Sequence, residues 1–264
     1  MGEMGTWRSY LAIGDSFTEG LSDLNPDGSY RGWADRVAEM LDRGVPDFRY
    51  ANLAVRGKLL ASIVEEQVPI AEQHRPELIS FCGGGNDVLR PGCNVVELSR
   101  IADDAIRRLV ATGAEVVVFT GFDPYGLPLR RRLRRLIAGF NELLRDIANE
   151  HGCRIVDLWS MRVLHDRRAW SVDRLHLSSE GHRRVALHTA EVLGLPATDE
   201  WRVPWPVALP RPWAVQRRED VRWVREYLAP WVRRLVTRHV PGSGCTPKRS
   251  ELLPFTRVER GLDV

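Results

Sequence analysis

Apolar residues follow two different spacings along the first 196 residues of the chain. Short unbroken apolar runs predict buried β-strands, and longer segments with an apolar residue at every third or fourth position predict helices. Five strands are expected, over residues 9–13, 48–53, 77–82, 115–120 and 154–158. Five helices are expected between and after them, over residues 31–43, 60–73, 95–111, 131–150 and 179–193.

This alternation of strands and helices predicts an α/β fold. The strand expected at 115–120 is nearly continuously apolar, which is typical of a parallel sheet covered by helices on both faces. We therefore expect a three-layer α/β/α arrangement around a five-stranded parallel sheet. Ligands of such sheets bind beyond the carboxyl ends of the strands. Ser16, Gly57 and Asn86 each follow a predicted strand, so all three are expected at that edge.

The pattern changes after Pro196, and we expect one α/β domain over residues 1–196 and a separate extension over 197–264. Residues 201–213 are rich in proline and predict an extended connector. An amphipathic helix, kinked near Pro230, is expected next from the spacing of Val221, Val224, Leu228, Trp231 and Leu235. Residues 240–250 are expected to be a flexible end.

Charge and tryptophan are concentrated in the extension. It holds 13 Lys and Arg against 8 Asp and Glu, whereas residues 1–196 hold 25 against 27. This excess is too small and too mixed with acids for a nucleic-acid-binding protein. The extension also carries five of the nine tryptophans, which are expected to pack on the α/β domain. A lid, a homodimer contact and a peripheral membrane contact stay open as alternatives.

Cysteine usage and hydropathy narrow the class of protein further. The four cysteines at 82, 93, 153 and 245 show no CxxC spacing, so reduced thiols are expected rather than disulfides or a metal site. No apolar stretch approaches the roughly 20 residues that span a bilayer, and the first residues lack the plan of a secretory signal. We expect a cytoplasmic protein without a transmembrane segment.

Three residues could perform nucleophilic catalysis. Ser16 directly follows the first predicted strand, within Gly14-Asp15-Ser16. A serine hydroxyl becomes a nucleophile when a base accepts its proton, and a carboxylate that orients an imidazole improves that base. His176 and Asp173 are the candidates for base and carboxylate. Each residue alone also fits an ordinary structural role, as a turn residue, a helix N-cap or an exposed loop histidine.

Acyl transfer also needs hydrogen-bond donors aimed at the developing oxyanion. The candidates are the backbone N–H groups of Ser16 and Gly57 and the side-chain amide of Asn86. A glycine at 57 lets the backbone approach a ligand closely, although an ordinary turn would also explain it. The tract Gly83-Gly84-Gly85 lacks the GxxxxGK[ST] and GxGxxG patterns, so it gives little support to a phosphate-binding loop.

Four blocks in this order resemble the SGNH, or GDSL, hydrolase superfamily: Gly14-Asp15-Ser16, Gly57, Gly84-Gly85-Asn86-Asp87 and Asp173-Arg174-Leu175-His176. The resemblance spans about residues 9–193. It implies a flavodoxin-like fold and a hydrolase of esters or thioesters that uses no cofactor, with residues 1–196 as the catalytic domain. It also implies that Ser16 is the nucleophile, His176 the general base and Asp173 its orienting acid, with Ser16, Gly57 and Asn86 as oxyanion donors.

Five residues are candidates to line the cleft, two of them within these blocks and three outside: Asp15, Asp87, Glu19, Trp33 and Phe122. For Asp15 and Asp87 we favour structural roles, with their carboxylates bonded to nearby backbone N–H groups. Ordinary packing explains Trp33 equally well. His182 is the nearest competitor of His176, but it falls inside the last predicted helix.

The residues together predict a serine hydrolase that cleaves a small-molecule carboxylic ester through an acyl-Ser16 intermediate. An acyltransferase with the same site, and a catalytically silent binding or scaffold protein, stay open as alternatives. The sequence does not determine the length of the acyl chain.

Overall fold

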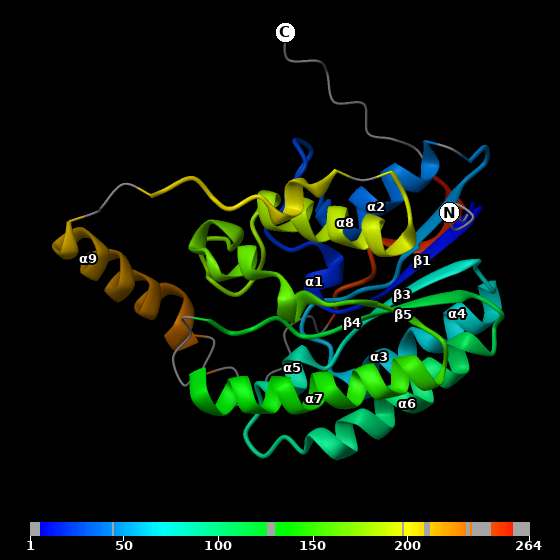
Figure 1. The fold of residues 1–264 in the computed structure, drawn as a ribbon, viewed down its shortest axis with the longest axis horizontal. Coiled ribbons are helices and arrows are strands. Elements are labelled where there is room, and N and C mark those ends of the chain that lie inside the picture. Colours follow the sequence, from blue (N-terminus) through cyan, green and yellow to red (C-terminus); the bar gives the residue numbers. More distant parts are fainter. Residues whose placement is uncertain are drawn as a thin grey trace, which may run out of the picture.

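The computed structural model describes residues 6–43, 45–125, 130–196, 198–208, 212–230, 233 and 244–255. They form a central β-sheet with helices on both faces (Figure 1). The strands are β1 (Ser9–Gly14), β2 (Arg49–Asn52), β3 (Leu78–Cys82), β4 (Glu115–Phe119), β5 (Arg154–Val156) and β6 (Arg249–Pro254). The α-helices are α1 (Ser16–Glu19), α2 (Gly32–Asp42), α3 (Leu60–Glu66), α4 (Val68–His74), α5 (Gly85–Val88), α6 (Val95–Val110), α7 (Arg130–Glu150), α8 (Ser179–Leu193) and α9 (Trp213–Trp223). Short helical turns are η1 (Leu158–Ser160), η2 (Arg162–His165), η3 (Arg167–Ala169) and η4 (Asp199–Arg202), and η5 (Val224–Leu228) is a π-helix.

The sheet has the strand order β5-β4-β3-β1-β2-β6, and its first five strands run parallel. Helices α2 and α8 cover one face, while α3, α4, α6 and α7 cover the other (Figure 1). Alternate residues of β1 enter the two cores, Tyr10 and Ala12 on the α2 side and Leu11 and Ile13 on the α6 side. Burial on both faces explains why residues 10–13 of this strand form an unbroken apolar run. The predicted three-layer α/β/α fold is therefore confirmed.

The sheet has one strand more than predicted. β6, from the C-terminal extension, pairs antiparallel with β2. The ring of Phe255 packs edge-on against Phe48 and Tyr50, with centroids 6.2 and 5.8 Å away. The flexible end expected over residues 240–250 is therefore wrong at Arg249 and Ser250, which begin β6; positions 240–243 lie outside the described residues. Most of β6 is exposed, so its sequence lacks the apolar run that marked the other strands.

The helix expected over 60–73 is divided into α3 and α4 at Gln67. Pro69 lacks the N–H that an unbroken helix would bond to the carbonyl four residues earlier. Gln67 is buried, and its side chain bonds to the backbone of Gly14 in β1, with Nε2 donating to O and Oε1 accepting from N, both at 2.9 Å. Gln67, which lies at this break, therefore bonds the two covering helices to the strand that precedes Ser16.

The extension contains the expected helix in a different form. α9 begins at Trp213, inside the predicted connector, and continues as η5 toward Pro230. Val221 and Val224 are 66% and 44% exposed, so the apolar positions from which the helix was predicted are not covered by the core. Trp231 and Leu235 lie outside the described residues. Across the described ranges, no helix combines the length and apolarity needed to cross a membrane.

The glycine tract before Asn86 provides a stability test. Gly84 has φ +92°, and a Cβ atom on it would lie 2.7 Å from Phe140 Cε1, whereas a Cβ on Gly85 would meet nothing within 4 Å. Gly84→Ala should lower the free energy of unfolding by about 1–3 kcal/mol, because it strains the backbone and overpacks the core. Gly85→Ala should change it by less than about 1 kcal/mol. Urea unfolding of both variants measures this; equal effects would contradict the packing described for Gly84.

Candidate active site

The turn after β1 places Ser16 at the carboxyl edge of the sheet. Gly14 fits there because a Cβ atom on it would lie 2.5 Å from Thr18 Oγ1 and 2.7 Å from the carbonyl oxygen of Cys82. Asp15 caps α1, and its carboxylate accepts a hydrogen bond from Phe17 N at 3.0 Å. Ser16 is thereby held as the first residue of α1, partly exposed.

The loop between η3 and α8 brings Asp173 and His176 to Ser16. His176 Nε2 lies 3.0 Å from Ser16 Oγ, and His176 Nδ1 lies 2.6 Å from Asp173 Oδ2. When Nδ1 donates its hydrogen to the carboxylate, Nε2 carries the lone pair that can accept the serine proton. The three predicted residues therefore form one hydrogen-bonded chain, although 160 positions separate Ser16 from His176.

The surroundings of Asp173 keep its side chain ionised. Burial alone would raise the pKa of this carboxyl group, but hydrogen bonds and the charge of His176 outweigh burial and hold the pKa well below its usual value. Ser171 Oγ donates to Oδ1 at 2.6 Å, and the backbone N–H of His176 donates to the same oxygen at 3.0 Å. A retained negative charge at this position can stabilise an imidazolium on His176.

Asn86 connects the loop that follows β1 with the loop that follows β2. Its Nδ2 donates to Asp15 Oδ2 at 3.1 Å and to the carbonyl oxygen of Lys58 at 3.0 Å. Because Asp15 adjoins Ser16 and Lys58 adjoins Gly57, these bonds bring the three predicted oxyanion donors to one edge of the sheet. Both hydrogens of the Asn86 amide are engaged, so donation to a ligand would share or replace one of these bonds.

The backbone at Ser16 and Gly57 is suited to donation. Gly57 has φ +75°, a conformation that favours glycine. Neither N–H group donates to any other residue in the described part of the chain. Ser16 and Gly57 are both partly exposed, so their N–H groups can serve a bound ligand.

Asp15 and Asp87 hold the loops together. Asp15 bonds to Phe17 and Asn86, as described above. Its side chain is also deeply buried, and burial raises its pKa to about 6. Asp87 Oδ2 accepts from Leu60 N at 2.9 Å, and burial likewise raises the pKa of this carboxyl group. Both side chains thus bond to backbone N–H groups, as the favoured sequence interpretation expected.

Three of the residues expected to line the cleft are buried instead: Asp15, as described above, and also Trp33 and Glu19. Trp33 is fully buried and packs against Phe119, with ring centroids 4.4 Å apart. Glu19 is 5% exposed and forms an ion pair with Arg56, with Oε1 2.5 Å from Nη2. The expectation that these three line the cleft is therefore wrong, because packing holds Trp33 inside, charge pairing holds Glu19 inside, and hydrogen bonds hold Asp15 inside. Phe122 is half-buried against Trp170, and its place in the cleft stays a prediction.

His182 does not compete with His176. It is 1% exposed; its Nδ1 accepts from Trp33 N and its Nε2 lies near the carbonyl oxygen of Leu21, both at 3.2 Å. Burial lowers its pKa to about 4, in keeping with a neutral ring whose Nδ1 is an acceptor. His182 therefore joins α8 to α2 and to the segment between α1 and α2.

Sequence reasoning missed several residues that support the site. Asn52 donates to the carbonyl oxygen of Thr18 at 3.0 Å, just beyond Ser16, and Gln67 bonds to Gly14 as described. Ser171 bonds to Asp173. The available signal was a polar residue within or beside an apolar segment, as at Asn52 and Gln67. Among the described residues, no group of three or more His, Cys, Asp or Glu side chains could hold a metal ion.

Several solved structures share this fold. TesA is 21% identical with a TM-score of 0.59, and the match covers 70% of this chain and 97% of TesA. Axe2, an acetylxylan esterase from Geobacillus stearothermophilus, is 18% identical with a TM-score of 0.60 and coverage of 75% and 100%. The psychrotrophic esterase EstA from Pseudoalteromonas sp. is 15% identical with a TM-score of 0.57 and coverage of 71% and 97%. At these identities the likeness shows the fold.

The sequence itself matches a family. A search of curated proteins found no match, but the model of the GDSL-like lipase/acylhydrolase family matches residues 12–184. This range is more than half of the chain and contains Ser16, Asn86, Asp173 and His176. The chain therefore belongs to the GDSL-like lipase/acylhydrolase family, and it is a carboxylic ester hydrolase.

Proposed function

We propose that this hydrolase cleaves its ester through a covalent acyl-Ser16 intermediate. The observation that carries the proposal is the hydrogen-bonded chain from Ser16 Oγ through His176 to Asp173, at 3.0 and 2.6 Å. Nucleophile, base and orienting carboxylate in such a chain are the arrangement that serine-dependent acyl transfer needs.

In the first half of the reaction, His176 Nε2 accepts the proton of Ser16 as Oγ attacks the ester carbonyl carbon. Asp173 stabilises the imidazolium that results. The imidazolium then gives this proton to the leaving alkoxy oxygen, so that the alcohol departs and the acyl group stays on Ser16. In the second half, His176 accepts a proton from water, whose oxygen attacks the acyl carbon. The same proton returns to Oγ as the carboxylic acid leaves.

Negative charge develops on the carbonyl oxygen in both halves. The backbone N–H groups of Ser16 and Gly57 are the proposed donors because no described residue takes their hydrogens. The Asn86 amide is the third proposed donor, and its bonds to Asp15 and Lys58 hold it beside the other two. Each such donor typically contributes on the order of 10²–10³ in turnover.

The proposed substrate is a small-molecule ester, and no cofactor is needed for these steps. Acetyl esters are suitable first substrates, since Axe2 is described as an acetylxylan esterase. Comparing acyl chains of increasing length would then define the pocket. Product analysis with added alcohols separates hydrolysis from acyl transfer to another acceptor. A cytoplasmic location stays a prediction.

Ser16→Ala should lower the turnover of p-nitrophenyl acetate by on the order of 10³-fold or more, because no oxygen remains to form the acyl-enzyme. The variant should also fail to react with a fluorophosphonate probe. Ser160→Ala is the matched control, since Ser160 is an exposed serine that bonds to the carbonyl oxygen of Asp157, outside the triad. Turnover of Ser16→Ala at the level of this control would refute the assignment.

Substitutions at His176 and His182 should separate catalysis from stability. His176→Ala should lose turnover as severely as Ser16→Ala, because both remove a member of one catalytic unit. His182→Asn should retain turnover while folded, yet lower the free energy of unfolding by about 1–3 kcal/mol through lost buried hydrogen bonds. Turnover of both variants at pH 7, together with urea unfolding, measures these effects. A folded but inactive His182→Asn would contradict the structural role assigned to His182.

His182 also predicts how stability depends on pH. Its folded pKa of about 4 lies below the ordinary value of 6.5, so the unfolded chain binds this proton more readily. The stability that it contributes is present above pH 6.5 and is lost as pH falls toward 4. Asp15, whose pKa is raised to about 6, has the opposite effect on stability: its contribution falls as pH rises toward and above 6. The difference in free energy of unfolding between wild type and His182→Asn, measured with urea, reports the contribution of the histidine alone. This difference should shrink as pH falls from 6.5 toward 4; a constant difference would contradict the assignment.

A further inference from the structure

The C-terminal extension contacts the loop that carries Asp173 and His176. Trp223 Nε1, at the end of α9, donates to the carbonyl oxygen of Asp173 at 2.8 Å. Asp220, one turn earlier, accepts from Arg174 Nη2 at 2.7 Å. The guanidinium carbon of Arg174 lies 4.6 Å from the centre of the Trp223 ring. Two residues of α9 thus hold two successive residues of the loop.

The contacted residue Arg174 has an unusual backbone conformation. Its φ is +59°, in the left-handed region that non-glycine residues seldom occupy. Such a conformation costs on the order of 1–2 kcal/mol and persists where surrounding contacts hold it. Because Arg174 lies between Asp173 and His176, its backbone angles set the positions of both side chains relative to Ser16. Contacts that fix Arg174 therefore act on the catalytic geometry.

The loop's own hydrogen bonds join its two ends and also bond its middle, where Arg174 N donates to the carbonyl oxygen of Ser171 and Leu175 N donates to Asp173 Oδ1, both at 3.0 Å. Trp170 and Leu177 pair across the base of the loop, and Ser171 N donates to the carbonyl oxygen of His176 at 2.8 Å. The carbonyl oxygen of Asp173 and the side chain of Arg174 are bonded instead to Trp223 and Asp220. The extension thus supplies bonds to the loop that the α/β domain does not.

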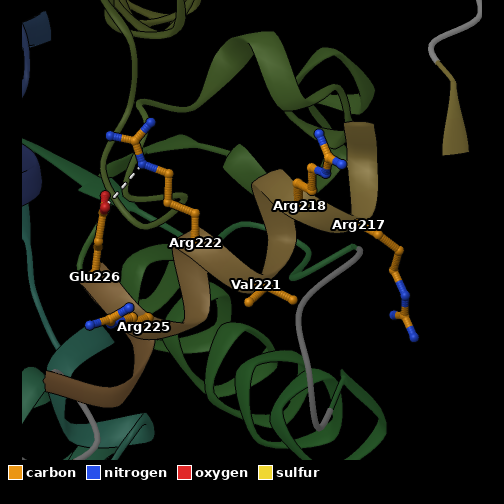
Figure 2. Close-up of a pocket in the computed structure, with 6 residues that line it drawn as sticks. All are labelled: Arg217, Arg218, Val221, Arg222, Arg225 and Glu226. Carbon is orange, nitrogen blue, oxygen red and sulfur yellow. Dashed lines mark hydrogen bonds and ion pairs between the residues drawn. The ribbon is translucent and has the colours of Figure 1, made fainter. Parts of the chain in front are cut away.

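α9 is not fixed by burial in the core. It lies outside the three layers (Figure 1) and buries none of its residues, and Trp213 at its start is 74% exposed. A groove of about 450 Å³ runs along α9 and η5 and is lined by Arg217, Arg218, Val221, Arg222, Arg225 and Glu226. Figure 2 shows these arginines pointing in different directions, with Arg222 paired to Glu226. Asp220 and Trp223 do not line this groove, so their contacts with the loop are a separate feature.

The extension also reaches the other side of the site. Lys248 Nζ lies 2.5 Å from the carbonyl oxygen of Glu19, at the end of α1, and 2.5 Å from Asp35 Oδ2. Ser16 begins the same helix. The extension therefore contacts both the segment that carries the hydroxyl and the loop that carries the imidazole.

We propose that Trp223 and Asp220 are positioning residues, which hold the Asp173–Arg174 segment so that His176 stays aligned with Ser16. The inference rests on the proposed function. It assigns the extension a role in turnover although the family match ends at residue 184. Misplacement of a catalytic group by about 1 Å can cost on the order of 10²-fold in rate, so two modest contacts at this point can matter.

Trp223→Phe tests the proposal because it removes the N–H donor and keeps an aromatic ring beside Arg174. In the full-length chain we expect kcat for p-nitrophenyl acetate to fall about 3- to 10-fold, the range typical of one lost hydrogen bond. KM should stay within about twofold, since the contact is made to the loop. Asp220→Asn should likewise lower kcat and leave KM within about twofold. The matched control is Trp213→Phe, at an exposed tryptophan of the same helix, which should leave kcat unchanged.

A double-mutant cycle separates positioning from a merely structural role. If Trp223 acts by keeping His176 aligned, then Trp223→Phe should change the residual kcat by less than about twofold in a His176→Ala background. A full additional loss in that background would overturn the proposal, as would a Trp223→Phe variant with the kcat of Trp213→Phe. An active Ser16→Ala would instead refute the proposed function, so the two failures are distinguishable.

Discussion

The hydrogen bond between Ser16 Oγ and His176 Nε2, 3.0 Å long, is the contact on which the arrangement of this molecule depends. It joins the turn after the first strand to a loop that comes after the last parallel strand, 160 residues later. A parallel sheet makes this possible because the carboxyl ends of its strands share one edge. α8 then returns to pack beside α2, and His182 ties these two helices together.

Strand ends leave backbone N–H and C=O groups that need partners once they are buried. Side-chain amides supply these partners around the site. Gln67 takes both backbone groups of Gly14, Asn52 bonds to Thr18, and Asn86 bonds to Lys58. Each amide joins two segments that are distant in sequence, so the loops hold one geometry before any substrate arrives. Prior organisation of this kind is what gives oxyanion donors their effect.

The parallel strands and the Ser16, Asp173 and His176 set could be predicted because their signals are local. An apolar run marks each buried strand, and short blocks of chemistry-bearing residues follow the strands. The edge strand β6 could not be predicted in this way, since most of it is exposed and it pairs with β2, which is distant in sequence. The burial of Trp33 and the pairing of Glu19 with Arg56 depend on contacts between segments. The same holds for Trp223 and Lys248, whose partners lie about 50 and more than 200 positions away.

The central claim is that the acyl group passes through Ser16. Its most direct test is to quench the enzyme with acid during turnover of p-nitrophenyl acetate and to locate the acetyl group by mass spectrometry of the digested protein. We predict an acetylated peptide that contains Ser16, modified at that residue. Acetylation at a different residue, or turnover with no acetylated protein under conditions that trap the intermediate of a comparable serine esterase, would contradict this claim.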